Sequence, residues 1–436
     1  MLSLGIATTF GVPRTVHVGT HIIHSPPRSR VHSRLTNGSS IPAGGAVWPT
    51  AIYWSTVSIG TPGVNFPVAI DSGSGDLDVA GKGCSGCVTK PPNNAYDPDA
   101  SSTSSPAFPY RFSNTCETSR VRTPRALERD ARGLTSVRIP LPDQTCDLKD
   151  PTAPCTISGS LHTDRVSLAG FGPVDVKFGA ILSQTSNFDQ FKEIDGVMGF
   201  TGGRSEDVFA SLVAAGLCEN VWAMCMRAGS KSNGTLTIGG VDPRLSDGEV
   251  HYVPDAGRGF HSVSVSSVML GDLRIPVGEA AILDTGTNVL LVPPSLYHQL
   301  QTQMCANPAL TSCAALWAND CVSLSDTQVD AYPPLALNLD GLALNMSSRD
   351  YLLLGSPLAT SAGQYCLGIR NGGSAGGSGF IIGDTTMRHY YLVFDLERKR
   401  IGWGNVNEAG CGSVDEGQVA VVRGAKVGLV ERGGVP

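Results

Sequence analysis

The chain contains VAIDSGSG at residues 68–75 and AILDTGTN at residues 281–288, two copies of one motif. In each copy apolar residues lead into an aspartate, a hydroxyl residue, a glycine and a second hydroxyl residue. Each copy is also followed by an apolar segment that ends in glycine, GVMG at 196–199 and FIIG at 380–383. A single Asp-Ser-Gly or Asp-Thr-Gly is an ordinary turn. Two copies in apolar text, each with its trailing segment, indicate instead two related lobes.

The aspartates of the two copies, Asp71 and Asp284, have the setting of a proton-sharing pair. A strand that leads an aspartate into a tight glycine turn exposes the carboxylate where backbone and hydroxyl donors can hold it. If two such turns face each other, both carboxylates cannot stay ionised, and the pair keeps one proton over a wide acidic range. The ionised member can then act as a base toward water and the protonated member as an acid. This chemistry predicts hydrolysis without a metal or a cofactor.

The composition favours a mainly β protein with two domains. With 436 residues the chain is too long for one ordinary core. Only 16% of residues are charged, while Gly and Pro number 52 and 28, which is typical of short strands joined by turns. The net charge of −6 gives no basic surface for nucleic acid, so we expect no such partner. No apolar run of about 18 residues occurs, so we expect no membrane span.

The twelve cysteines favour disulfides in an oxidising compartment, because they are even in number and lack the spacing with histidines that zinc sites need. One CxxC, at Cys84 and Cys87, is weak evidence for metal or redox chemistry. The sequons at Asn233 and Asn345 are glycosylation candidates, and a third lies at Asn37. We expect disulfides among Cys84, Cys87, Cys146, Cys155, Cys225, Cys305, Cys313, Cys321, Cys366 and Cys411.

From about Trp54 to Cys411 the chain resembles the pepsin-like aspartic peptidases. The resemblance is carried by phrases in the family's order, among them VSIGTP (57–62), YDPDASSTS (96–104), GSLHTDRVSL (159–168), IDGVMGF (194–200), LTIGGVDP (236–243) and FIIGDTTMRHYYLVFDLERKRIGWG (380–404). It implies a two-lobed double β-barrel with a central active-site cleft, an extended polypeptide substrate, and a flap that closes over it. It also implies inhibition by pepstatin-type compounds.

By position in the family's motif, Asp71 and Asp284 would be the catalytic dyad. Six neighbours would support it. Of these, Ser74 and Thr287 would bond the outer oxygens of the dyad, and Ser72 and Thr285 would brace the two loops against each other. The full set of support residues is Ser72, Gly73, Ser74, Thr285, Gly286 and Thr287.

The distribution of cysteines resembles the plant nepenthesin-like branch and its fungal relatives, which implies pairs between Cys321 and Cys366 and between Cys225 and Cys411. Two departures concern the flap. Asp78 stands where the family usually has a tryptophan, and the flap region CDLKDPTAPCTISGSL (146–161) lacks the usual tyrosine. Both absences together suggest a differently built flap, tied by Cys146 and Cys155. We expect Asp78 to be an exposed residue at the end of a strand, in preference to a third catalytic acid.

The chain divides into four expected segments. Residues 1–45 form a leader whose first 40 residues carry four arginines and no acidic residue; by resemblance it is a prosegment, cut between Arg34 and Val47. Residues 46–240 and 241–412 are the N-terminal and C-terminal lobes, and residues 413–436 are a disordered tail. Within the first lobe, residues 120–138 contain six arginines and are interpreted as a flexible inserted loop, a processing site or retained non-coding sequence.

The sequence therefore predicts a secreted or vacuolar aspartic endopeptidase, monomeric, made as a zymogen and active at acidic pH. The alternative is a catalytically weak relative that binds peptides or protease inhibitors through the same cleft. Intact Asp71, Ser74, Asp284 and Thr287 favour the enzyme, whereas the missing flap tyrosine and tryptophan favour the binder. A third hypothesis is a β-rich surface or wall-binding protein with chance Asp-Thr-Gly turns.

Overall fold

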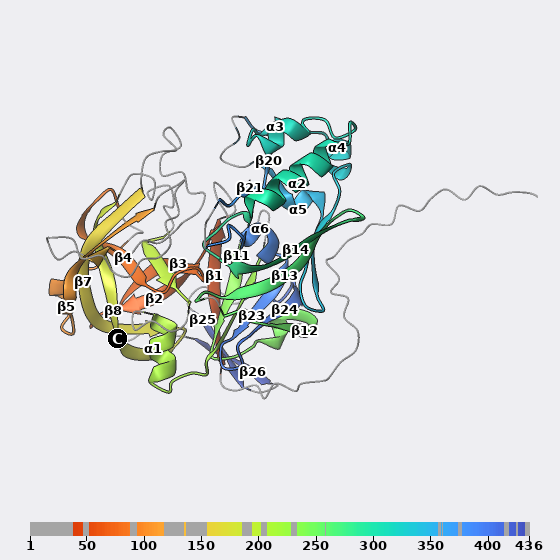
Figure 1. Cartoon of the computed structure of the whole chain (residues 1–436). Helices are drawn as coiled ribbons and strands as arrows, with labels where there is room; N and C mark the ends of the chain where they lie inside the picture. The colour runs from red at the N-terminus through yellow and green to blue at the C-terminus, as the bar shows by residue number, and fades with distance from the viewer. Residues whose placement is uncertain are drawn as a thin grey trace, which may run out of the picture.

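Strands dominate the computed structural model of the chain, and they gather into two lobes (Figure 1). The expected mainly β, two-lobed architecture is confirmed. The structure describes residues 38–46, 52–87, 94–116, 135–136, 155–184, 194–201, 207–227, 233–257, 259–355, 359, 361–373, 377–413, 418–423 and 426–431.

The N-terminal lobe is a closed barrel with the strand order β2-β3-β9-β4-β8-β7-β5-β6, in which β2 also pairs with β7. Alternate residues of β3, such as Phe66, Val68 and Ile70, are buried in its core, as the apolar text predicts. Its elements are β2 (Ile52–Ile59), β3 (Val64–Asp71), β4 (Leu77–Ser85), the 3₁₀ helix η1 (Pro98–Ala100), β5 (Ser105–Cys116), β6 (Thr135–Ser136), β7 (Cys155–Leu168), β8 (Phe171–Gln184), β9 (Gly196–Gly199) and α1 (Val208–Ala214).

Strands from both halves of the chain form a continuous sheet between the lobes, in the order β12-β24-β23-β10-β11-β1. The halves join where β10 pairs with β23, with Val221 opposite Asp395. The boundary expected at residue 240 thus falls within one shared sheet. Its strands are β1 (Gly38–Ala46), β10 (Val221–Met226), β11 (Asn233–Ile238), β12 (Ser246–Pro254), β23 (Tyr390–Asp395) and β24 (Arg400–Val406), with η3 (Pro243–Leu245) before β12.

The C-terminal lobe has a sheet in the order β18-β17-β13-β14-β22-β15-β21, a small sheet β16-β20-β19, and short helices. Its elements are β13 (Ser262–Leu270), β14 (Leu273–Leu283), β15 (Leu290–Val292), α2 (Pro294–Cys305), α3 (Cys313–Trp317), β16 (Val322–Ser323), α4 (Asp326–Asp330), β17 (Leu335–Asn338), β18 (Ala343–Met346), α5 (Ser348–Tyr351), β19 (Leu352–Leu354), β20 (Gln364–Leu367), β21 (Ile369–Asn371), β22 (Ile381–Ile382) and α6 (Asp384–Met387).

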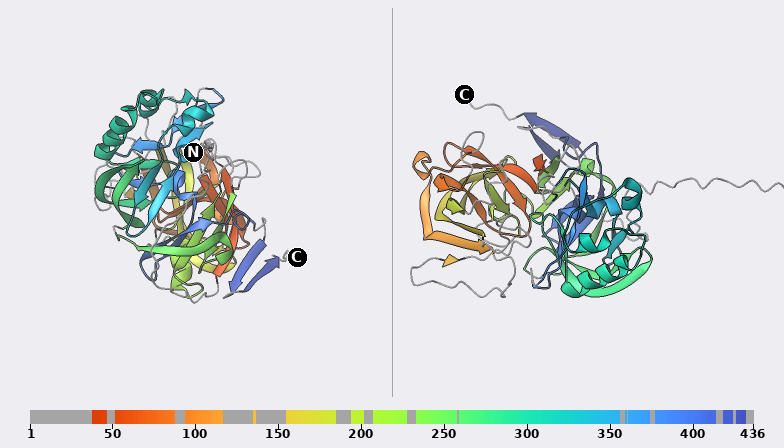
Figure 2. Two further views of the ribbon diagram at one scale, coloured as in Figure 1. Left: turned by 90° about the vertical axis from the view of Figure 1, so that its right-hand side faces the viewer. Right: turned by 90° about the horizontal axis from the view of Figure 1, so that it is seen from above.

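Two of the expected segments contain strands. Strand β1 begins at Gly38, inside the range assigned to the leader, because it pairs with β11 along most of its length. The tail expected to be disordered contains a hairpin of β25 (Gln418–Arg423) and β26 (Lys426–Glu431), visible in dark blue near the C-terminus in Figure 2. The valine-rich run VAVV (419–422) suits a strand, and the open edge of β1 gives it a partner. Most of the interval 120–138 lies outside the described residues.

The disulfide interpretation of the cysteines is confirmed for eight of them. Cys84 is bonded to Cys87, and Cys305 to Cys313. The two pairs implied by the resemblance, Cys225–Cys411 and Cys321–Cys366, are both present.

The expected tie between Cys146 and Cys155 falls partly outside the described residues, because Cys146 is not among them. The backbone register of β5 and β7 places Cys116 opposite Cys155. Within the described part of the chain, Cys218 is a free thiol.

Candidate active site

Both aspartates of the repeated motif lie where a strand runs into a turn. Asp71 is the last residue of β3, which pairs in parallel with β9, and Asp284 directly follows β14, which pairs in parallel with β22. The trailing apolar segments GVMG and FIIG supply β9 and β22. The two halves of the chain therefore build the same local structure, in which the strand that leads to the aspartate pairs in parallel with the strand of the trailing apolar segment.

Each turn holds its own aspartate with the same two donors. The backbone N–H of Gly73 donates to Asp71 Oδ1 at 2.8 Å, and the Ser74 hydroxyl donates to Asp71 Oδ2 at 2.5 Å. In the second lobe the N–H of Gly286 and the hydroxyl of Thr287 donate to the two oxygens of Asp284, at 2.8 and 2.6 Å. Both carboxyl groups are thereby fixed in orientation.

The two aspartates lie against each other's turns. A Cβ atom added to Gly73 would lie 2.5 Å from the carboxyl carbon of Asp284, and one added to Gly286 would lie 2.8 Å from Asp71 Oδ1. The carboxyl groups of Asp71 and Asp284 are also close enough to share a hydrogen bond. Glycine is required at both positions because each side-chain site is occupied by the opposite carboxyl group.

Ser72 and Thr285 lock the two turns together through four reciprocal bonds. The N–H of Ser72 donates to Thr285 Oγ1 at 3.0 Å, and the N–H of Thr285 donates to Ser72 Oγ at 2.9 Å. Each hydroxyl in turn donates to a carbonyl of the opposite strand, Ser72 to Leu283 at 2.9 Å and Thr285 to Ile70 at 2.7 Å. The brace that the resemblance implied for this pair is thus present in the hydrogen bonding.

Burial and proximity set the protonation of the pair. Asp71 and Asp284 are 3% and 5% exposed. Burial in the first place, and the charge of Asp284 in the second, raise the pKa of Asp71 far above its usual range, against the opposing hydrogen bonds from Ser74 and Gly73. Asp71 therefore keeps its proton to higher pH than a free aspartate, next to a second carboxyl group.

A third carboxyl group near the pair escaped the sequence reasoning. Asp384, at the start of α6, is fully buried, and neither of its oxygens has a hydrogen-bond partner in the described structure. Burial, and more weakly the charge of Asp284, raise its pKa well above the usual range, while Arg388 opposes them. The sequence signal for Asp384 is its place directly after the glycine of FIIGD (380–384).

The expectation for Asp78 is wrong, because this residue is 3% exposed in β4. It pairs with Val197 of β9, and Asp71 pairs with Gly199, two residues further on. Residues two apart share a face of a strand, so Asp78 lies on the sheet face that carries Asp71. Its Oδ2 has no hydrogen-bond partner in the described structure. Burial first, and Asp76 second, raise the pKa of Asp78 to about 8.

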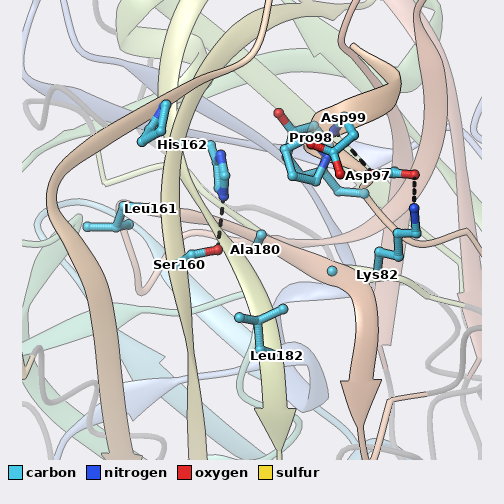
Figure 3. Close-up of a pocket in the computed structure, with 12 residues that line it drawn as sticks. Lys82, Asp97, Pro98, Asp99, Ser160, Leu161, His162, Ala180 and Leu182 are labelled. Carbon is cyan, nitrogen blue, oxygen red and sulfur yellow. Dashed lines mark hydrogen bonds and ion pairs between the residues drawn. The ribbon is translucent and has the colours of Figure 1, made fainter.

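A separate cavity of about 440 Å³ lies in the N-terminal lobe and is lined by neither dyad aspartate (Figure 3). On one side Lys82 forms an ion pair with Asp97 at 2.6 Å, and on another His162 hydrogen-bonds Ser160 at 2.9 Å. Two pairs of its polar side chains are thus bonded to each other, while Nδ1 of His162 has no hydrogen-bond partner in the described structure. We assign the candidate active site to the dyad.

The remaining predicted site residues are two sequon asparagines, and both are half-buried. Asn233 opens β11 and donates to the carbonyl of Gly412 at 3.4 Å, and Asn345 lies within β18 and donates to that of Ala343 at 3.5 Å. The described residues contain no group of three or more His, Cys, Asp or Glu that could hold a metal ion. Among the helices of the described residues, none is long and apolar enough to cross a membrane.

Comparison with known proteins accounts for this geometry. Residues 52–112 and 145–406 match the family model described as eukaryotic aspartyl protease. The chain is 23% identical to pepsin A of Sus scrofa over 358 residues, 80% of each protein. It is 25% identical to cathepsin E of Mus musculus over 379 residues, 80% of this chain and 79% of that one. With pepsin A of Gallus gallus it shares 23% identity over 86% of this chain and 90% of that one. The chain belongs to the eukaryotic aspartyl protease family.

Proposed function

We propose that this protein is an aspartic endopeptidase that hydrolyses peptide bonds at acidic pH, with Asp71 and Asp284 as its catalytic dyad. The observation that carries the proposal is the contact between the two carboxyl groups across Gly73 and Gly286, with each carboxyl group held by its own turn. Family membership supports the reaction class. Polypeptides in extended conformation are the proposed substrates.

In this mechanism the ionised aspartate takes a proton from a water molecule between the carboxyl groups, and the water oxygen bonds to the scissile carbonyl carbon. The protonated aspartate polarises the carbonyl oxygen. Breakdown of the tetrahedral intermediate cleaves the C–N bond, and the leaving nitrogen takes up a proton from the dyad. The dyad returns to its singly protonated state when the products leave, so it acts catalytically without an added group.

The support residues keep this pair in register. The outer hydroxyl groups of Ser74 and Thr287 hold the oxygens turned away from the shared proton, which leaves the inner oxygens for water. The reciprocal bonds of Ser72 and Thr285 fix the distance between the turns. Both effects lower the reorganisation needed during the reaction, which is the source of catalysis by fixed polar groups.

We further propose that the protein is made as a zymogen, glycosylated at Asn233 and Asn345, and delivered as a monomer by the secretory pathway to the exterior or the vacuole. The disulfides between Cys225 and Cys411 and in the C-terminal lobe support an oxidising destination. The CxxC disulfide and the cysteine pattern support a place in the nepenthesin-like branch and its fungal relatives.

Proteolysis of a denatured protein between about pH 3 and 5 tests the proposal, with and without pepstatin. The folded, processed protein should cleave, pepstatin should block the cleavage, and Asp284→Asn should abolish it. The Asp340→Asn variant, at an exposed position, is the matched control and should cleave like the wild type. A folded wild type that binds pepstatin yet cleaves nothing would replace the proposal by the peptide-binding alternative.

A further inference from the structure

A histidine outside the repeated motif lies between the two catalytic turns. His261 directly precedes β13 in the C-terminal lobe and is 2% exposed. Its ring Nε2 lies 2.7 Å from the carbonyl oxygen of Phe200, in the N-terminal lobe. A carbonyl oxygen can only accept, so Nε2 carries the proton and donates. The bond crosses from one lobe to the other.

Each end of this bond is connected to the backbone at or next to one of the two aspartates. The N–H of Phe200 donates to the main-chain carbonyl of Asp71 at 2.8 Å, so the backbone of Phe200 bonds Asp71 through its N–H and His261 through its carbonyl. The carbonyl of His261 accepts from the N–H of Leu283 at 2.8 Å, and Leu283 immediately precedes Asp284. The result is a path of three hydrogen bonds from the backbone of Asp71 through Phe200 and His261 to Leu283, the residue before Asp284.

This path uses none of the four hydrogen bonds of the brace between Ser72 and Thr285. The two meet at Leu283, whose carbonyl accepts from Ser72 and whose N–H donates to His261. The N–H and the carbonyl of Leu283 are therefore both fixed, one by each connection. The brace joins the two turns within the motif itself. His261 joins Leu283, at the end of the strand before Asp284, to Phe200, which directly follows β9.

The ring of His261 is held firmly in place. Its centroid lies 4.8 Å from that of Phe394 and 6.1 Å from that of Trp222, and these two rings stack on each other at 3.9 Å. On the C-terminal side its Nδ1 lies 3.8 Å from the carboxylate of Asp255. The interaction with His261 helps to lower the pKa of Asp255 against the effect of burial. A ring fixed on three sides can set the position of the carbonyl to which it donates.

We propose that His261 is a positioning residue for the dyad: through Nε2 it holds the peptide that supports Asp71, and through its carbonyl it holds the strand that carries Asp284. This inference rests on the proposed function. It assigns His261 no contact with substrate. Its effect should therefore fall on the rate of the chemical step, with little effect on substrate binding.

The test compares His261→Phe, which keeps the ring shape but has no donor, with His261→Gln, whose amide can replace the Nε2 donor. His298→Phe on the exposed face of α2 is the control. Active sites are counted by pepstatin titration, and kcat and KM are measured per site. We expect His261→Phe to lower kcat on the order of 10- to 100-fold with little change in KM. His261→Gln should recover most of the loss, and the control should match the wild type.

A second measurement does not depend on activity. Hydrogen exchange of the peptide covering residues 194–201 should become faster in His261→Phe, because the backbone of Phe200 loses one of its two hydrogen bonds, and should stay near the wild-type rate in His261→Gln. If the wild type shows no pepstatin-sensitive cleavage, the proposed function is wrong. Hydrogen exchange of residues 194–201 would still test the role of His261.

Three results would overturn the role of His261. One is a His261→Phe variant with the kcat per site of the wild type and unchanged exchange. Another is a His261→Phe variant that has fewer pepstatin-titratable sites but an unchanged kcat per site, which would mean a purely structural role. The third is a failure of His261→Gln to recover either readout.

Discussion

Replacing Asp78 by Asn should make the folded protein much less sensitive to rising pH. Asp78 is buried in β4, its Oδ2 lacks a hydrogen-bond partner in the described structure, and burial raises its pKa from 3.8 to about 8. Asparagine has nearly the same shape and cannot ionise. The substitution therefore removes one titration and little packing.

The magnitude follows from the shift of about four pKa units, each worth about 1.4 kcal/mol, which together give about 6 kcal/mol. Because the pKa is raised in the folded state, the stabilising contribution is complete below the unfolded pKa of 3.8 and is lost as pH rises through about 8. The loss is comparable to the whole stability of an ordinary domain, about 5–15 kcal/mol.

The assay is urea unfolding at a series of pH values from about 4 to 8, performed in an Asp284→Asn background so that self-digestion is absent. The free energy of unfolding of Asp78→Asn, relative to its parent, should rise by about 6 kcal/mol across the series. The exposed Asp340→Asn variant should show no such trend. Parallel stability curves for Asp78→Asn and its parent would refute the reasoning, since they would mean that Asp78 titrates alike in the folded and unfolded states.

Other predictions concern the turns and the long disulfide. Gly73→Ala should abolish proteolysis while pepstatin binding also falls, because its Cβ would lie 2.5 Å from the carboxyl carbon of Asp284; normal turnover would contradict the packing. Ser72→Ala should destabilise the protein by about 1–3 kcal/mol in urea unfolding, because it leaves buried partners without a bond; an unchanged midpoint would argue against the brace. Removing the Cys225–Cys411 disulfide by Ala substitutions should cost about 5 kcal/mol, given its separation of 186 residues; calorimetry that shows no lowering of the melting temperature would oppose this.

The dyad and the fold class were predictable because their signals are local and repeated. An aspartate at the end of an apolar run, followed by a glycine turn, specifies a strand end whatever surrounds it. The second copy, and the trailing segments that became β9 and β22, indicated that the two ends belong together. The pairs Cys225–Cys411 and Cys321–Cys366 came from resemblance, since spacing alone leaves the connectivity open.

The differences from expectation fall where a residue's surroundings depend on distant partners. GSSIPAGGA carries little strand pattern of its own, and it forms β1 because β11, β2 and β25 offer it hydrogen bonds. Asp78 stood in an ordinary DLDV sequence, and nothing local indicated that its side chain is shielded from water. Local sequence describes backbone preference, whereas strand pairing and burial are set by segments far away in the chain.

By itself, the sequence determined that two Asp-hydroxyl-Gly turns exist, that each ends an apolar strand, and that a protein of short strands in two lobes carries them. Only the tertiary structure decided that Gly73 and Gly286 lie against the opposite carboxyl groups, and that His261 is hydrogen-bonded to both Phe200 and Leu283. The physical reason is that a carboxyl group's pKa and a hydrogen bond depend on atoms within a few ångströms. Folding brings those atoms together from positions more than 200 residues apart, as in the bond between Ser72 and Thr285.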